Sequence, residues 1–179
     1  MNSDLERRHR FELVAAHVYE PLQHYLRRRA APDDAADALS ETLLTVWRRL
    51  DDVPNDLPLP WCYGVAKRCL ANQRRAARRH LRLVERIRTE AAISPSHETD
   101  DPALEAALSE LSESDQELLR LWAWEQLEPR EIALVLETTP NAVSLRLSRA
   151  KAKLESRLSR QDSSVVGQKR DRHTEEHRP

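Results

Sequence analysis

Residues 127–158, LEPREIALVLETTPNAVSLRLSRAKAKLESRL, carry the most informative pattern in this sequence. Pro129 and Pro140 each suit the first position of a helix, where a missing backbone N–H leaves no hydrogen bond unmade. Thr139 can cap the second helix with its hydroxyl. The stretch therefore predicts a short helix over about 129–136, a tight turn, and a longer helix that begins at 140.

The longer helix has two faces of different character. Apolar residues recur along it at steps of three and four, which places them on one buried face. That face consists of Val143, Leu147, Ala150, Leu154 and Leu158. A short helix, a turn and a basic helix with small polar residues near its start form the helix-turn-helix arrangement, whose second helix presents its first turns to base edges in the major groove. The residues expected to lie against duplex DNA are Asn141, Ser144, Leu145, Arg146, Ser148 and Arg149. A helical hairpin whose basic face is simply solvated remains an alternative at this point.

Composition favours helix almost throughout. The chain has 179 residues, enough for one ordinary domain or two small ones, and Gly64 and Gly167 are its only glycines. Aromatic residues are few, whereas the helix formers Ala, Leu, Arg and Glu dominate. We expect an all-α protein.

The distribution of charge is more informative than its sum, which is −1. Residues 67–88 contain nine Lys or Arg and a single acid, whereas residues 98–117 contain eight acids and no Lys or Arg. Two basic blocks, this one and the helix that begins at 140, flank the acidic block. The pattern predicts a polyanion bound at two places, although a solvated basic helix face is the simpler interpretation of either block alone.

Other classes of site find little support. No run of about 18 apolar residues exists, and the N-terminus lacks the apolar core of a signal peptide, so we expect a cytoplasmic protein. Cys62 and Cys69 are seven residues apart on a predicted helix, about 10 Å along its axis and too far to bridge. We expect them to be small buried groups, and we expect no metal or cofactor.

Periodicity and turn residues predict the remaining helices. They are expected over about 4–29, 34–50, 59–91, 102–111 and 114–126, with a loop at 51–58, a boundary at 93–102 and a disordered tail from 161. Ser114 and Glu117 fit a capping box at the start of the helix over 114–126. Leu118, Leu119, Leu121 and Trp122 are the expected core face of that helix.

These pieces in this order resemble a sigma factor of the sigma-70 family, of the short extracytoplasmic-function group. Residues 34–47, DAADALSETLLTVW, resemble the region-two signature DAEDLVQETFLRVW, although Ala36, Ala38 and Ser40 depart from it. Residues 59–75 resemble the segment that follows, with Trp61 in register.

The C-terminal half resembles region four of the same family more closely. Residues 108–121 resemble its LxxLPxxxREVLLL opening, and residues 131–133 and 143–154 resemble EIAEILG and VKSRLHRARARL. Glu137 replaces the turn glycine, and Leu145 replaces a polar residue. The resemblance covers roughly residues 10–160.

The resemblance implies two small helical domains joined by a flexible linker. Region two would be a three-helix domain over residues 4–92, and residues 93–102 would be the linker. Region four would be a four-helix domain over 103–160 that contains the helix-turn-helix, followed by the tail over 161–179. The family has no catalytic activity of its own, so we expect no enzyme.

The resemblance also implies partners and their sites. Region two would bind the clamp helices of the largest subunit of core RNA polymerase, through Asp34, Asp37, Ser40, Glu41 and Leu44. It would also bind the minus-ten promoter element, through Asn55, Trp61, Lys67, Arg68, Arg74, Arg75 and Arg78. Region four would read the minus-thirty-five element with the six helix-turn-helix residues named above, and the flap region of the polymerase is a further expected partner. Family members are often held inactive by an anti-sigma protein, so we expect such a partner here.

Three alternatives remain open on the sequence. A stand-alone helix-turn-helix regulator would bind duplex DNA without the polymerase, but it would need a dimer face or a sensor domain. A helical interaction protein would use its basic faces for an acidic protein. A sigma-like protein would bind polymerase yet initiate poorly, given the substitutions at Ala36 and Ala38.

Overall fold

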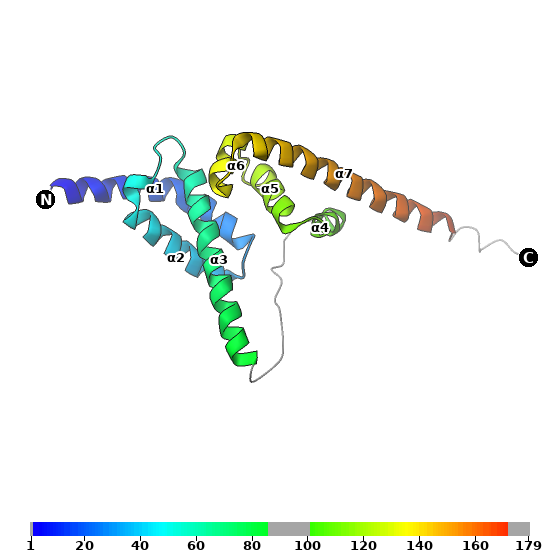
Figure 1. Cartoon of the computed structure of the whole chain (residues 1–179), viewed down its shortest axis with the longest axis horizontal. Coiled ribbons are helices and arrows are strands. Elements are labelled where there is room, and N and C mark those ends of the chain that lie inside the picture. The colour runs from blue at the N-terminus through cyan, green and yellow to red at the C-terminus, as the bar shows by residue number, and fades with distance from the viewer. Residues whose placement is uncertain (1, 86–100, 172–179) are drawn as a thin grey trace, which may run out of the picture.

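The computed structural model describes residues 2–85 and 101–171, and every regular element in these two ranges is helical (Figure 1). The elements are α1 Asn2–Arg27, α2 Pro32–Arg48, the 3₁₀ helix η1 Leu50–Asp52, α3 Pro58–Glu85, α4 Pro102–Ser109, α5 Glu113–Ala123, α6 Pro129–Leu136 and α7 Pro140–Asp171. The predicted all-α class is confirmed.

The N-terminal half is a bundle of α1, α2 and α3, each of which packs against the other two. Leu22 and Leu26 of α1 and Val46 of α2 are completely buried between these helices. The rings of Phe11 and Trp47 meet edge to face, with centroids 5.2 Å apart. The apolar residues whose spacing predicted these helices therefore form the core of the bundle.

The C-terminal half contains α4 to α7, with α6 and α7 forming the predicted helix-turn-helix. Ile132 of α6 and Val143 of α7 are completely buried, as the apolar periodicity requires. Glu137 turns the chain between the helices with a left-handed backbone, φ 54°. The hydroxyl of Thr139 accepts a hydrogen bond of 3.3 Å from the amide of Ala142, so the predicted cap is confirmed.

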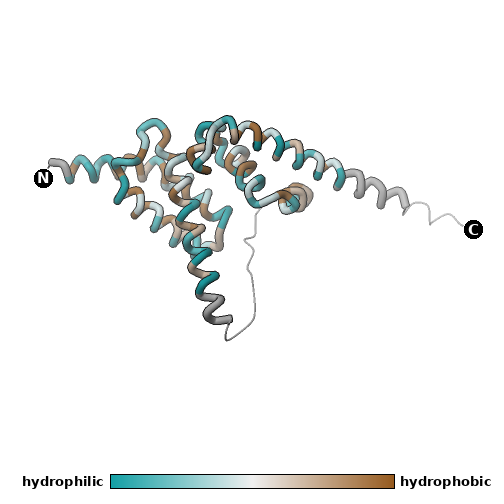
Figure 2. Tube along the Cα trace, viewed as in Figure 1, coloured by the Kyte–Doolittle hydropathy of each residue, from teal (hydrophilic) through white to brown (hydrophobic). Residues whose placement is uncertain are grey.

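The two halves pack against each other, chiefly through α3 and α6. Buried apolar side chains of both halves belong to one connected cluster. In Figure 2 the hydrophobic stretches concentrate where the helices meet, and the coloured turns of α3 that project beyond them are largely hydrophilic. Gly64 lies in this contact, where a Cβ atom would stand 3.7 Å from the Cα of Val135. A glycine in the interior of α3 therefore faces the backbone of α6.

The ends of two helices differ from the prediction. Ser112, rather than Ser114, caps α5 by accepting a hydrogen bond of 3.2 Å from the amide of Asp115. The capping-box prediction is wrong because Ser114 already lies inside the helix, and Glu117 bonds to the N-terminal half instead.

The expected disordered tail is also wrong for residues 161–171, which continue α7. This segment contains no proline, and it extends a helix that is already nucleated, so each further residue adds a hydrogen bond without a new nucleation cost. Residues 172–179, the expected linker up to residue 100, and the end of the helix expected over 59–91 lie outside the described residues.

Candidate nucleic-acid interface

The outer face of the first turns of α7 is open to solvent. Asn141, Ser144, Ser148 and Arg149 are exposed, and Leu145 has 54% of its surface accessible. Arg146 is half-buried at the edge of this face. The structure therefore brings together all six residues predicted to lie against duplex DNA, and we call them the reading face. An exposed leucine among hydrogen-bonding side chains suits contact with a thymine methyl group.

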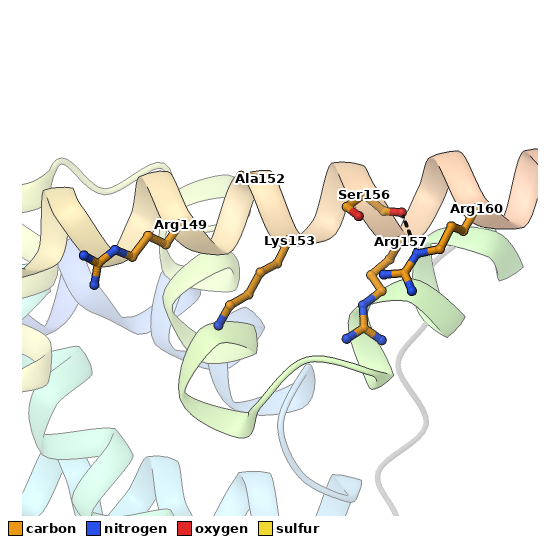
Figure 3. A pocket seen from close by; sticks show the side chains of 6 residues that line it. All are labelled: Arg149, Ala152, Lys153, Ser156, Arg157 and Arg160. Atoms are coloured by element: carbon orange, nitrogen blue, oxygen red, sulfur yellow. Dashed lines mark hydrogen bonds between the residues drawn. The ribbon is translucent and has the colours of Figure 1, made fainter.

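Basic residues continue along α7 beyond the reading face. Together with Ala152 and Ser156 they line an open depression of about 460 Å³ (Figure 3). Those basic residues are Arg149, Lys153, Arg157 and Arg160.

Two of these basic residues are paired within the C-terminal half. The ammonium of Lys153 donates a hydrogen bond of 2.7 Å to Asp115, and Arg157 pairs with Glu110. The hydrogen bond from Lys153 is the main reason why the pKa of Asp115 is lowered. Part of the acidic block thus neutralises part of the second basic block.

One aromatic residue lies outside the core where the sequence predicted it inside. Trp122 of α5 is 41% exposed, so its predicted place in the core face is wrong. The ammonium of Lys151 sits 3.3 Å from the centroid of its ring. Lys151 of α7 therefore covers the indole of Trp122 by a cation–π contact, which helical periodicity does not reveal.

The predicted polymerase-binding residues share an exposed face of α2. Asp34, Asp37, Ser40 and Glu41 are exposed, and Leu44 has 46% of its surface accessible. On the opposite side of α2, Ala35, Ala38, Leu39 and Thr42 are buried in the bundle. A face that combines carboxylates with an exposed leucine suits a protein partner. The assignment of this face to the polymerase stays a prediction.

The residues predicted for the minus-ten element fall into two groups. The first lies on the outside of the N-terminal half. Lys67, Arg75 and Arg78 of α3 are exposed, and so is Asn55, which accepts a hydrogen bond of 3.3 Å from Arg10. Trp61 is half-buried against the core with the guanidinium of Arg49 5.6 Å from its ring centroid.

The second group, Arg68 and Arg74, is exposed but bonds to other parts of the chain. Arg68 pairs with Glu137, the turn residue of the helix-turn-helix. Arg74 donates a hydrogen bond of 2.6 Å to the backbone carbonyl of Arg29. Two predicted DNA contacts are thus occupied by other parts of the chain, one of them across the two halves.

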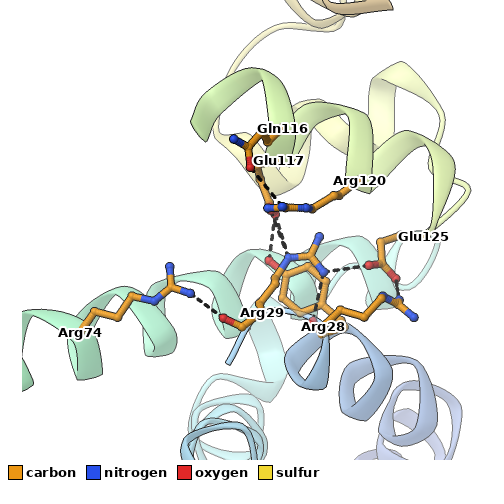
Figure 4. A network of polar contacts seen from close by, with 8 residues as sticks. Arg28, Arg29, Arg74, Gln116, Glu117, Arg120 and Glu125 are labelled. Carbon is orange, nitrogen blue, oxygen red and sulfur yellow. Dashed lines mark hydrogen bonds and ion pairs between the residues drawn. The ribbon is translucent and has the colours of Figure 1, made fainter. Parts of the chain in front are cut away.

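A charged cluster where the two halves meet was not anticipated from the sequence (Figure 4). Arg29 binds Glu117 through Nε at 3.1 Å and Glu125 through Nη1 at 3.0 Å. Arg28 binds the second oxygen of Glu125 at 2.6 Å. We call Arg28, Arg29, Glu117 and Glu125 the Arg29 cluster. Two arginines at the end of a helix normally indicate a solvated surface, so only the three-dimensional contact identifies them.

Burial governs the chemistry of the neighbouring groups. Desolvation raises the pKa of Tyr25 and Tyr63, and the carboxylates of the Arg29 cluster add to the effect. Burial lowers the pKa of Arg29, but Glu117, Tyr25 and Glu125 raise it by more, so that its guanidinium stays charged. Cys62 and Cys69 are buried, as predicted, and desolvation raises the pKa of Cys62 to about 12.

The described part of the chain offers no cluster of three or more His, Cys, Asp or Glu side chains suited to a metal ion. Within the same residues, no helix has both the length and the apolar character needed to cross a membrane.

The family of the C-terminal half follows from its sequence together with this geometry. A family model described as sigma-70, region 4 matches residues 102–154, which run from α4 through the reading face. Residues 102–154 are therefore similar to region 4 of the sigma-70 family. No curated protein matches the full sequence of the chain.

Solved structures extend the likeness to both halves of the chain. The sigma factor RpoE from Bartonella quintana, solved with the anti-sigma factor NepR, has a TM-score of 0.63 at 21% identity, over 83% of this chain and 96% of that one. CnrH, solved with the cytosolic domain of CnrY, has a TM-score of 0.57 at 25% identity, over 83% of this chain and 87% of that one. The PhyRSL–NepR complex from Sphingomonas sp. Fr1 has a TM-score of 0.60 at 19% identity, with 82% and 87% covered. The chain therefore has the helical fold of these structures.

Proposed function

We propose that this protein is an alternative sigma factor, a subunit that binds core RNA polymerase and directs it to promoters. The observation that carries the proposal is the exposed reading face at the start of α7, inside the segment that matches sigma-70 region 4. The fold class of both halves supports the same function. The protein would supply recognition, and phosphodiester chemistry would stay with the polymerase, so we propose no enzymatic activity.

The two basic blocks would bind different promoter elements. The reading face would take the minus-thirty-five element, and the exposed residues of α3 with Asn55 and Trp61 would take the minus-ten element. The acidic face of α2 would dock on the clamp helices of the polymerase, and region four would lie near the flap. We further propose that region two ends before residue 93 and that region four begins at about 103.

Each half alone would bind DNA weakly, and its affinity would depend strongly on salt because the contacts are mostly ionic. Docking on one polymerase raises the effective concentration of each half at its element once the other is bound. This coupling explains why two small domains on one chain suffice for promoter recognition. We also propose a cytoplasmic location, because a subunit of the polymerase works where the polymerase is.

An anti-sigma protein is a proposed partner. RpoE and CnrH were both solved in complex with such proteins or their domains, and their folds resemble this one. The exposed Leu44 and Trp122 are apolar side chains that a protein partner could cover. Neither residue identifies the partner.

Run-off transcription with purified core polymerase tests the proposal. A library of promoter fragments is transcribed with and without the protein, and we expect defined start sites that appear only with it. DNA binding without any redirection of the polymerase would instead favour the stand-alone regulator, for which the comparisons offer no support.

A matched pair of variants tests whether initiation depends on the face of α2 proposed to bind the polymerase. Glu41→Ala should lower initiation at limiting protein, whereas Glu12→Ala, which removes an equally exposed acid on α1, should not. If both variants initiate like the wild type, Glu41 is not part of the polymerase interface.

A further inference from the structure

The open depression on α7 continues the reading face along the same helix (Figure 3). Arg149 belongs to both, and the other residues of the depression follow it toward the C-terminus. Ser156, Arg157 and Arg160 lie beyond residue 154, where the match to sigma-70 region 4 ends. This end of the depression therefore belongs to a part of the chain that the family model does not cover.

The charge of the depression suits an extended anion. Four of its six described lining residues are cationic, and none of the six is acidic. Arg149 and Arg160, at its two ends, are about 16 Å apart along the helix axis at 1.5 Å per residue. One strand of duplex DNA carries a phosphate for about every 3.4 Å of its axis. Cations spread over about 16 Å therefore match a run of DNA backbone better than a single phosphate group.

The cations at the two ends of the depression are available to a ligand. Arg149 and Arg160 are both exposed. Within the described residues, the ion pairs that the depression makes with acids are those of Lys153 and Arg157. Nε of Arg160 donates a hydrogen bond of 3.1 Å to the backbone carbonyl of Ser156, which leaves its two Nη groups for an external anion (Figure 3). The exposed hydroxyl of Ser156 is a further group of the kind that binds DNA phosphates.

The two central cations are held by acids of the same half. Lys153 binds Asp115 at 2.7 Å, and the carboxylate is protected because its side chain is only 12% exposed. Arg157 binds Glu110, whose side chain is 49% exposed. An exposed ion pair is weak, so a phosphate that arrives from solvent can replace Glu110 on Arg157. The two pairs therefore differ in how readily DNA could exchange with them.

We propose that the depression binds the backbone of duplex DNA beside the minus-thirty-five element, with Arg160 as a phosphate contact, and that Glu110 competes with the DNA for Arg157. The proposal rests on the DNA-binding function proposed for the reading face, because that function places the duplex against α7. Phosphate contacts fix the position of the protein without reading bases, so the depression would add affinity and the reading face would supply discrimination. Glu110 would limit this added affinity, which is the same for every sequence.

The salt dependence of binding tests the contact of Arg160. Fluorescence anisotropy of the full-length protein is measured from about 50 to about 200 mM salt, on a selected minus-thirty-five duplex with flanks and on a scrambled duplex of equal length. Arg160→Gln should weaken binding to both duplexes by the same factor and lower the slope of log affinity against log salt by about 1. Arg8→Gln, which removes an exposed arginine of α1, should change neither.

Two results of this series would overturn the phosphate contact. One is an Arg160→Gln variant with wild-type affinity and slope, once circular dichroism shows that its helix content is unchanged. The other is a loss of affinity that is confined to the selected duplex, because that loss would make Arg160 a base-reading residue.

Glu110→Gln tests the competition through a gain of binding. The variant frees Arg157, so binding to both duplexes should tighten by about two- to fivefold, the equivalent of one exposed ion pair. Glu113→Gln, which removes an exposed acid from the first turn of α5, should tighten it less. The double variant Glu110→Gln with Arg157→Gln should lose the gain. A double variant that keeps the gain, or a Glu110→Gln variant without one, would overturn the competition.

Failure of this site and failure of the proposed function would give different results. Run-off transcription that persists in every variant, with unchanged DNA binding by Arg160→Gln and Glu110→Gln, would overturn the site and leave the sigma function supported. Absence of initiation from every protein, with the expected changes in DNA binding, would overturn the sigma function and leave the site supported. Binding of a poly-glutamate peptide that Arg160→Gln weakens, with DNA binding unchanged, would assign the depression to an acidic protein and overturn the proposal.

Discussion

Gln126 and Glu137 are the two described residues other than glycine with a left-handed backbone, both at φ 54°. This conformation costs a residue with a Cβ atom about 1–2 kcal/mol, and glycine avoids it. Glu137, which replaces the usual turn glycine, makes an exposed ion pair with Arg68 that offsets part of this cost. The substitution could be read in the sequence, but its partner is 69 residues away and could not.

Gln126→Gly should therefore stabilise the protein. We expect the free energy of unfolding to rise by roughly 1 kcal/mol, after the greater flexibility of glycine in the unfolded chain offsets part of the strain. Denaturant unfolding followed by circular dichroism measures the change. Glu137→Gly should gain less, because it also loses the pair with Arg68. An equal gain at both positions would mean that this exposed pair contributes nothing.

The bond between Lys153 and Asp115 should appear as a pH-dependent contribution to stability. Because the folded state lowers the pKa of Asp115 below its ordinary value of 3.8, the contribution is present above about pH 4 and is lost as the pH falls through the folded pKa. Lys153→Met should lower the free energy of unfolding by up to about 1 kcal/mol at pH 7. The difference from the wild type should shrink below pH 4.

Lys67→Met is the control for this pH series, since it removes an exposed lysine of α3. Thermal unfolding of all three proteins from pH 3 to 7 provides the comparison. A difference between Lys153→Met and the wild type that persists unchanged at pH 3 would argue against the carboxylate of Asp115 as its source.

At the scale of elements, α3 carries a glycine in a position where most helices would carry alanine. A Cβ atom on Gly64 would make ordinary contacts of 3.7 Å with the backbone of Val135. Gly64→Ala should therefore raise the free energy of unfolding by about 1 kcal/mol, the difference in helix propensity between the two residues. Thermal unfolding at two protein concentrations measures it, and a loss of stability would show that α6 cannot accept even a methyl group.

The reading face of α7 should bind DNA through Arg149. Arg149→Ala is expected to weaken binding to a selected minus-thirty-five fragment by about tenfold or more, as for the loss of one base-reading arginine. Fluorescence anisotropy at fixed salt provides the measurement. Arg8→Ala, an exposed arginine of α1 outside every predicted interface, should bind like the wild type. Equal binding by both variants would remove Arg149 from the reading face.

Local elements were predictable because their signals are local. Pro129, Thr139 and Pro140 mark the helix-turn-helix within a dozen residues, and its apolar positions follow the helical period. The positions of Ser112 and Trp122 were not predictable in the same way. Ser112 and Ser114 both lie near the start of α5, and either could cap it. The indole of Trp122 packs against Lys151 of α7 and not in the core. For the predicted interfaces, the structure supplies exposure and grouping, and their partners remain predictions.

At the scale of the whole molecule, the packing of α3 on α6 was beyond sequence patterns. Basic and acidic blocks indicated charge attraction in general, yet the pairing of Arg29 with Glu117 and Glu125 depends on two halves meeting in one orientation. The division of the chain into two domains stays a prediction beside this contact. Sequence periodicity reports which face of a helix is buried, but it does not report which distant helix buries it.

A larger residue at position 64 should separate the halves. The side chain of Gly64→Leu extends well beyond a Cβ atom that already touches the backbone of α6, so it must displace that helix. We expect a larger radius of gyration than for Gly64→Ala at similar helix content, measured by small-angle scattering. If both variants are equally compact, the contact between α3 and α6 accommodates a leucine and the prediction is wrong.

The unbroken course of α7 has a mechanical consequence. The helix runs from Pro140 to Asp171, 32 residues or about 48 Å at 1.5 Å per residue, with its first turns in the reading face. Because α7 is one continuous helix, the direction of its C-terminal turns depends on how its first turns lie in the major groove. A rigid fluorescent label on the C-terminal turns of α7 would therefore report the angle of the protein on its promoter.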